Sequence, residues 1–164
     1  MLRWVLFVLF FGICAAAVKQ KAKVTKPPNL SRGWGDGITW VKNYEEGLSK
    51  MVKSKKPLMV IHHREDCPHS KELKKAFLAK RSVLKMAKED FIMLNVVEEI
   101  PDVNMAPDGY YVPRILFVDP TKVVRNDIMG KYSDYRFNYR ADDMELLKLN
   151  MMKAKLPLDL RTEL

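Results

Sequence analysis

The sequence contains little cysteine: Cys14 and Cys67 are the two thiols among 164 residues. Cys14 lies in an amino-terminal apolar segment that we expect to be removed, so Cys67 would be alone in the mature chain. A single thiol excludes an internal disulfide bond. In a protein of the secretory pathway, an odd cysteine indicates either pairing with another molecule or a reactive thiol. An inert, buried cysteine is the alternative.

Long hydrophobic runs are also missing. The uncharged stretch over residues 4–18 has 15 residues, whereas a helix that crosses a bilayer needs roughly 20. Residues 1–17 instead have the order of a secretory signal peptide, because Arg3 precedes an apolar run that ends in Ala15-Ala16-Ala17. A short membrane anchor is the alternative. We predict cleavage after Ala17 and no membrane span.

The last four residues of the sequence are Arg161, Thr162, Glu163 and Leu164. They resemble the Lys-Asp-Glu-Leu class of retrieval signals, which a receptor reads in the early secretory pathway. Together with the signal peptide, they predict a protein of the endoplasmic-reticulum lumen with a retrieval receptor among its partners. Molecules that escape retrieval would be secreted.

Acidic residues are too few to balance the basic ones, and the net charge of the full chain is +9. Part of the excess lies in residues 18–33, which carry four lysines and Pro27-Pro28 without apolar periodicity. We predict that this segment is a disordered basic tail. The compartment excludes nucleic acid as a partner. Asn29 opens the triplet Asn-Leu-Ser and is a candidate N-glycosylation site.

The apolar pattern predicts one α/β domain over residues 34–156, followed by a tail over residues 157–164 that carries the retrieval signal. Helices are expected over residues 39–52, directly after Cys67, over residues 82–88 and from residue 142 onwards; strands are expected over residues 57–63, 91–97, 114–119 and 123–129. A long helical connection makes the first two strands parallel. A short connection makes the last two strands an antiparallel hairpin. The expected fold is a mixed central sheet flanked by helices.

Residues 65–73, EDCPHSKEL, have the layout of a redox motif in which Ser70 takes the place of a second cysteine. Cys67 stands where the first strand gives way to a helix, and Pro68 suits the first helical position. The unpaired N–H groups and the dipole at the start of a helix favour a thiolate there. Ser70 can donate a hydrogen bond to the thiolate, and His69 would favour it when cationic, whereas Glu65 and Asp66 oppose it.

The missing second cysteine decides what chemistry this motif can support. A thiolate can attack a disulfide and form a mixed disulfide with another polypeptide. Ser70 cannot then release that polypeptide, because a hydroxyl is not a competent attacking group at neutral pH. The motif therefore predicts capture or isomerisation of disulfides without an oxidation cycle of its own.

Several segments together resemble a known family. A strand that ends at a cysteine opening a helix, followed by Val112-Pro113 before a hairpin, resembles the thioredoxin fold. The segments SRGWGD, KPLMVIHH, CPHS, PDG-x-YVPR, FVDP and the terminal TEL resemble those of the anterior-gradient proteins, a branch of the protein disulfide isomerase group. The resemblance covers nearly all of residues 31–164.

This resemblance implies the roles of further residues. It implies that the Val112-Pro113 bond is cis and that Pro68, Val112 and Pro113 shape the groove for a client, with Cys67 as the attacking thiol tuned by His69 and Ser70. It also implies that the first helix contributes Glu46 and Lys50 to a homodimer. An ion pair within one helix is the alternative for these two charges.

We expect a single-cysteine, disulfide isomerase-like chaperone whose clients are cysteine-rich secretory proteins; the resemblance implies mucins among them. The rival hypothesis is a secreted protein of development or regeneration that binds a cell-surface receptor through the same scaffold. A purely structural interaction module is a third. No cofactor is expected. No metal site is expected either, because the adjacent His62 and His63 would point to opposite faces of a strand.

Overall fold

The computed structural model describes residues 29–156. The predicted signal peptide, residues 18–28 of the predicted basic tail, and the tail with the retrieval signal lie outside the described residues. No helix within residues 29–156 is long and apolar enough to cross a membrane.

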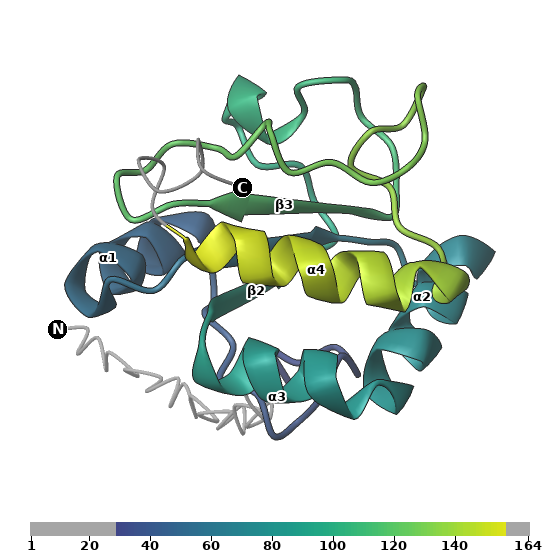
Figure 1. Cartoon of the computed structure of the whole chain (residues 1–164), viewed down its shortest axis with the longest axis horizontal. Helices are drawn as coiled ribbons and strands as arrows, with labels where there is room; N and C mark the ends of the chain where they lie inside the picture. Colours follow the sequence, from purple (N-terminus) through teal and green to yellow (C-terminus); the bar gives the residue numbers. More distant parts are fainter. Residues whose placement is uncertain (1–28, 157–164) are drawn as a thin grey trace, which may run out of the picture.

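The described chain forms a three-stranded sheet with helices on both faces (Figure 1). In chain order the elements are α1 (Tyr44–Ser54), β1 (Leu58–His62), α2 (Pro68–Ala79), α3 (Arg81–Glu89), β2 (Ile92–Val96), the short 3-10 helix η1 (Val103–Met105), β3 (Arg114–Val118), the 3-10 helix η2 (Ala141–Asp143) and α4 (Met144–Lys155). The strand order is β2-β1-β3. β1 is parallel to β2, as the helical connection predicts, and antiparallel to β3. This confirms the mixed sheet flanked by helices.

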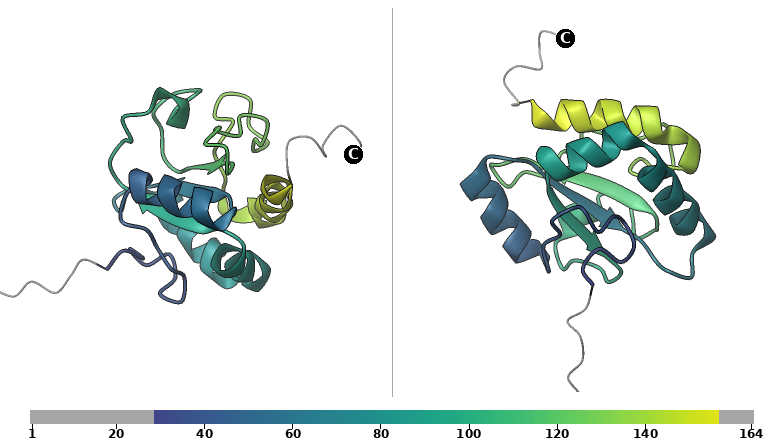
Figure 2. Two further views of the ribbon diagram at one scale, coloured as in Figure 1. Left: turned by 90° about the vertical axis from the view of Figure 1, so that its left-hand side faces the viewer. Right: turned by 90° about the horizontal axis from the view of Figure 1, so that it is seen from below.

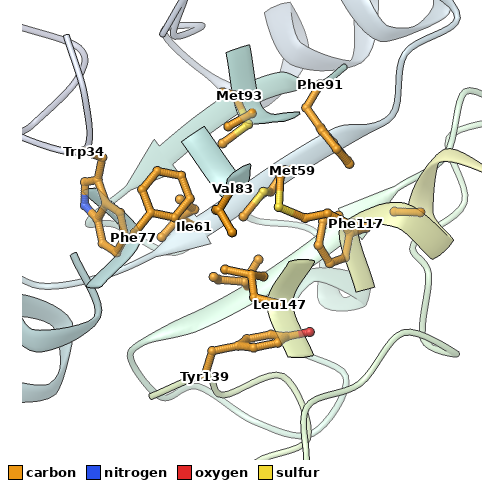
Figure 3. Packing of buried hydrophobic residues seen from close by; sticks show 14 of the residues in the cluster. Trp34, Met59, Ile61, Phe77, Val83, Phe91, Met93, Phe117, Tyr139 and Leu147 are labelled. Carbon is orange, nitrogen blue, oxygen red and sulfur yellow. The ribbon is translucent and has the colours of Figure 1, made fainter. Parts of the chain in front are cut away.

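The sheet is buried on both sides because its strands are almost continuously apolar. Alternate residues of β1 face two separate clusters: Met59 and Ile61 join the cluster of α2, α3 and α4, whereas Leu58 and Val60 join that of α1. Figure 2 shows these helices on the two sides of the sheet. Phe77 of α2 and Leu147 of α4 belong to the first cluster, part of which is drawn in Figure 3. The strand that leads to Cys67 is thus held from both faces.

Two predicted elements are wrong in part. The helix expected over residues 39–52 begins only at Tyr44, where the Asn43 side chain accepts a hydrogen bond from the Glu46 N–H. Trp40 lies at helical spacing from Tyr44, but its backbone instead forms a parallel β-bridge with Met93 of β2. A pairing with the neighbouring strand therefore overrides the apolar period at this end.

The strand expected over residues 123–129 is reduced to one backbone pairing, between Val118 and Val124. The chain then turns, because the Ile128 N–H donates to the Arg125 carbonyl. The buried Arg125 guanidinium also binds the Asp127 carboxylate at 2.7 Å. The hydrogen bond between these two side chains thus favours a turn over continued pairing with β3.

The fold also begins before the predicted boundary at residue 34. Residues 29–33 form turns against the end of β2 rather than part of a disordered tail. The Asn95 side chain donates to the Leu30 carbonyl at 2.9 Å, and the Arg32 guanidinium donates to the Asn95 carbonyl at 2.9 Å. These long-range bonds cannot be inferred from the composition of the segment.

Candidate functional site

Cys67 is the residue that caps the amino-terminal end of α2. Its backbone is extended, Pro68 follows as the first helical residue, and the Lys71 N–H donates to the Cys67 carbonyl. Cys67 is partly exposed. The free N–H groups of the first helical turn and the helix dipole stabilise negative charge at this position. The sequence prediction of a thiol at the start of a helix is confirmed.

The peptide bond between Val112 and Pro113 is cis, as the family resemblance implies. It lies next to the thiol, since the Cys67 Sγ is 3.9 Å from the Val112 carbonyl oxygen. The Asn138 side chain donates to the Pro113 carbonyl at 2.9 Å. The carbonyl of Val112 therefore lies beside the thiol, and Asn138 holds the loop through its bond to the Pro113 carbonyl.

Ser70 occupies the place of a second cysteine, one turn into α2, and is 2% exposed. Its hydroxyl oxygen accepts a hydrogen bond from the Arg64 N–H at 3.3 Å, so it holds the loop that leads to Cys67. This role was not predicted. The expected donation from Ser70 to the thiolate stays a prediction.

His69 points away from the protein interior, with 72% of its side chain exposed. Its Nδ1 lies 3.9 Å from the Glu72 carboxylate in the next turn of the helix. Its expected influence on the thiolate also stays a prediction.

Asp66, one of the two acidic residues before Cys67, is partly neutralised, which sequence reasoning missed. Arg64 binds both carboxylate oxygens of Asp66, at 3.0 and 2.6 Å. This bond holds the pKa of Asp66 below its ordinary value. The opposition of Asp66 to a thiolate is therefore weaker than the sequence predicts. The signal was available, because a cation stands two residues before this carboxylate.

Arg114, directly after the cis proline, is fully buried and anchors the loop over residues 105–113. Its guanidinium donates to the Tyr111 carbonyl at 2.7 Å and to the Met105 carbonyl at 3.2 Å. It also binds the Glu99 carboxylate and lies 3.2 Å from His62 Nδ1. Sequence reasoning placed Arg114 in a strand without a role. A charge that opens an otherwise apolar strand was the available signal, because a buried charge requires partners.

His62 and His63 are both about 1% exposed, and they lie on different sides of the sheet. His62 contacts Arg114, whereas the ring of His63 lies 5.3 Å from that of Trp34 in an edge contact. Burial lowers the pKa of His62 to about 3 and that of His63 to about 4. Among residues 29–156, no three metal-binding side chains come together.

The other predicted site residues lie elsewhere. On α1, Lys50 Nζ is 2.9 Å from a Glu46 carboxylate oxygen, so the two charges pair within one helix. The role of this pair in a homodimer stays a prediction. Asn29 is exposed and uses its side chain to accept from the Ser31 N–H. Its glycosylation is a prediction too.

Comparisons with known proteins agree with this geometry. A family model described as thioredoxin-like matches residues 39–120. Anterior gradient protein 1 of Xenopus tropicalis is 58% identical over 126 residues, which cover 77% of this chain and 67% of that protein. Anterior gradient protein 3 of Homo sapiens is 54% identical over 140 residues, covering 85% of this chain and 83% of that protein. Anterior gradient protein 2-B of Xenopus laevis is 51% identical over 160 residues, covering 97% and 96%.

The resemblance that the motifs carry is thus confirmed over most of the sequence. The cysteine at the start of α2, the cis proline beside it and the three strands of the mixed sheet all lie within residues 39–120, the range that the family model matches. This chain, with its thioredoxin-like fold, belongs to the anterior gradient family.

Proposed function

We propose that this protein is a disulfide isomerase-like chaperone of the endoplasmic-reticulum lumen that forms mixed disulfides through Cys67. Its clients would be cysteine-rich secretory proteins, mucins among them. One observation carries the proposal: Cys67 is partly exposed at the start of α2, and its sulfur lies 3.9 Å from the carbonyl oxygen of Val112, which precedes the cis proline. Residues 1–17 and 161–164 support the compartment through their sequence alone.

The reaction follows from thiol–disulfide exchange. The Cys67 thiolate attacks one sulfur of a client disulfide, a new disulfide forms between the two chains, and the second client sulfur leaves as a thiolate that takes up a proton. Another client thiol then attacks the mixed disulfide and regenerates Cys67. The client disulfide has moved, and there is no net oxidation. Ser70 cannot carry out this second attack, so the adduct persists until a client thiol does.

Client adducts should disappear when Cys67 is replaced with alanine. We expect wild-type protein, expressed in secretory cells and blocked with N-ethylmaleimide at lysis, to give high-mass bands on non-reducing gels that collapse on reduction. Cys67→Ala should give no such bands, because it lacks the attacking sulfur. Its circular dichroism should match that of the wild type. Equal bands in both proteins would contradict the proposal.

The same variant separates this proposal from receptor binding. If the protein acts outside the cell through its surface, its activity on responsive cells would survive Cys67→Ala. If it acts through exchange, that activity would be lost together with the adducts.

A further inference from the structure

A groove of about 600 Å³ opens beside the thiol site. It is lined by residues from three places, namely the start of α2, the loop over residues 105–113 and the segment over residues 131–140: His69, Tyr111, Val112, Lys131, Tyr132, Ser133, Asp134, Tyr135, Asn138 and Arg140. Three of these residues are tyrosines, so the groove offers ring faces as well as polar groups. We call it the tyrosine groove.

The tyrosine groove is continuous with the thiol site through two shared residues. Val112 lines the groove, and its carbonyl oxygen lies 3.9 Å from the Cys67 sulfur. His69 lines the groove and belongs to the reactive motif itself. A polypeptide whose cysteine is joined to Cys67 therefore lies at the entrance of the groove.

The walls of the groove are held in place by the protein. The Tyr111 hydroxyl donates to Asp108 at 2.8 Å and accepts from the Phe137 N–H at 3.0 Å. The Tyr111 and Tyr135 rings make an edge contact at 4.8 Å. A groove that is already ordered binds an extended segment at a lower entropic cost.

Lys131 and Arg140, the two basic side chains of the groove, differ in how free their charges are to bind a ligand. The Lys131 ammonium is 2.5 Å from the buried Asp143 carboxylate, so its charge is largely neutralised. The Arg140 guanidinium stacks on the Tyr132 ring at 4.4 Å, and within residues 29–156 it has no ion pair with a carboxylate. A guanidinium presents a planar fork of donors that fits a carboxylate. Asp134 is the one carboxylate among the lining residues and opposes an anion.

We propose that the tyrosine groove binds the stretch of a client next to its reacting cysteine, and that Arg140 selects stretches with an acidic side chain. This inference rests on the proposed exchange at Cys67. The occupant is part of the same polypeptide that forms the mixed disulfide. The groove thereby gives a single-cysteine protein a preference among disulfides that the thiol alone cannot supply.

Short cysteine peptides with a pyridyl disulfide test this preference. Attack by the Cys67 thiolate forms the mixed disulfide with the peptide and releases pyridine-2-thione, which takes the electron pair and a proton and is followed by absorbance. Peptides that differ only in carrying Glu, Gln, Lys or Phe near the cysteine are compared on the processed chain, which lacks residues 1–17 and therefore has Cys67 as its one thiol. We expect the Glu peptide to react about three- to tenfold faster than the Lys peptide, in line with one partly solvated charge-assisted hydrogen bond.

Three variants test which side chain causes the preference for the Glu peptide over the Lys peptide. Arg140→Gln should bring the ratio of the Glu and Lys rates close to one, whereas Asp134→Asn should raise the rate with the Glu peptide. Arg81→Gln is the matched control, because Arg81 is exposed at the start of α3 and does not line the groove. It should leave the ratio unchanged.

The neutral reagent 2,2′-dithiodipyridine separates this inference from the proposed function, since it reports on the thiol alone. No reaction of the native protein with this reagent would overturn the proposed exchange. A normal reaction with the reagent, combined with equal rates for the Glu and Lys peptides, would overturn the groove inference alone. A preference for the Phe peptide that survives Arg140→Gln would also overturn it, because the rings would then select the client.

Discussion

Replacing Ser70 with cysteine is expected to turn a protein that holds its clients into one that releases them. Residue 70 lies three positions after Cys67, on the same face of α2, and is 2% exposed. A thiol there would attack the mixed disulfide within the same chain. Because an attack within one molecule has a high effective concentration, we expect the steady-state level of adducts to fall about tenfold or more.

This result is measured on non-reducing gels after rapid alkylation, and mass spectrometry should detect a new disulfide between residues 67 and 70. Ser70→Ala is the matched control. It removes the hydrogen bond to the Arg64 N–H but adds no thiol, so its adducts should persist. Adducts of unchanged abundance in Ser70→Cys would show that release does not depend on a missing second thiol.

Acid is expected to destabilise this fold through two buried histidines. Burial first, and then the charge of Arg114, lower the pKa of His62 from 6.5 to about 3. The Glu99 carboxylate, 3.7 Å from His62, would favour protonation, but it is bound to Arg114. Burial likewise lowers the pKa of His63 to about 4, against a hydrogen bond from the imidazole to the Asn95 side chain, which favours protonation.

The direction of the effect follows from proton uptake. Below pH 6.5 the histidines of the unfolded chain bind protons, whereas those of the folded chain stay neutral until about pH 3 to 4. Stability is therefore complete above pH 6.5 and falls as the pH drops towards the folded values. At pH 5 each histidine should cost about 2 kcal/mol, since one pKa unit corresponds to about 1.4 kcal/mol.

Urea unfolding between pH 7 and pH 5 measures this loss. His62→Gln and His63→Gln should each remove about half of it, because each leaves one buried imidazole. His69→Gln, at an exposed position, is the matched control and should leave the slope unchanged. A pH dependence that persists in the double variant at positions 62 and 63 would assign the acid sensitivity to other groups.

The local parts of this molecule could be predicted from the sequence. β1 is an uninterrupted apolar run after Pro57, and Cys67 with Pro68 marks the start of α2, so the position of the thiol follows from neighbouring residues. The cis bond at Pro113 came from the resemblance to a family, because a sequence alone does not distinguish the two isomers.

The surroundings of the thiol could not be predicted in the same way. Asn138 supports Pro113 from 25 positions away, and Arg114 contacts His62 across 52 positions. Trp40 shows the same limit, since its helical spacing is overridden by a pairing with Met93. Such contacts depend on the packing of the sheet, which apolar periodicity does not encode.

The most direct measurement is the rate at which iodoacetamide modifies Cys67 in the native full-length chain, followed by mass spectrometry of the peptide that contains it. We expect iodoacetamide to modify Cys67 in the native protein without urea, because this residue is partly exposed at the start of α2. Modification of Cys67 only after unfolding would contradict it, because a thiol closed off by the fold could not reach a client.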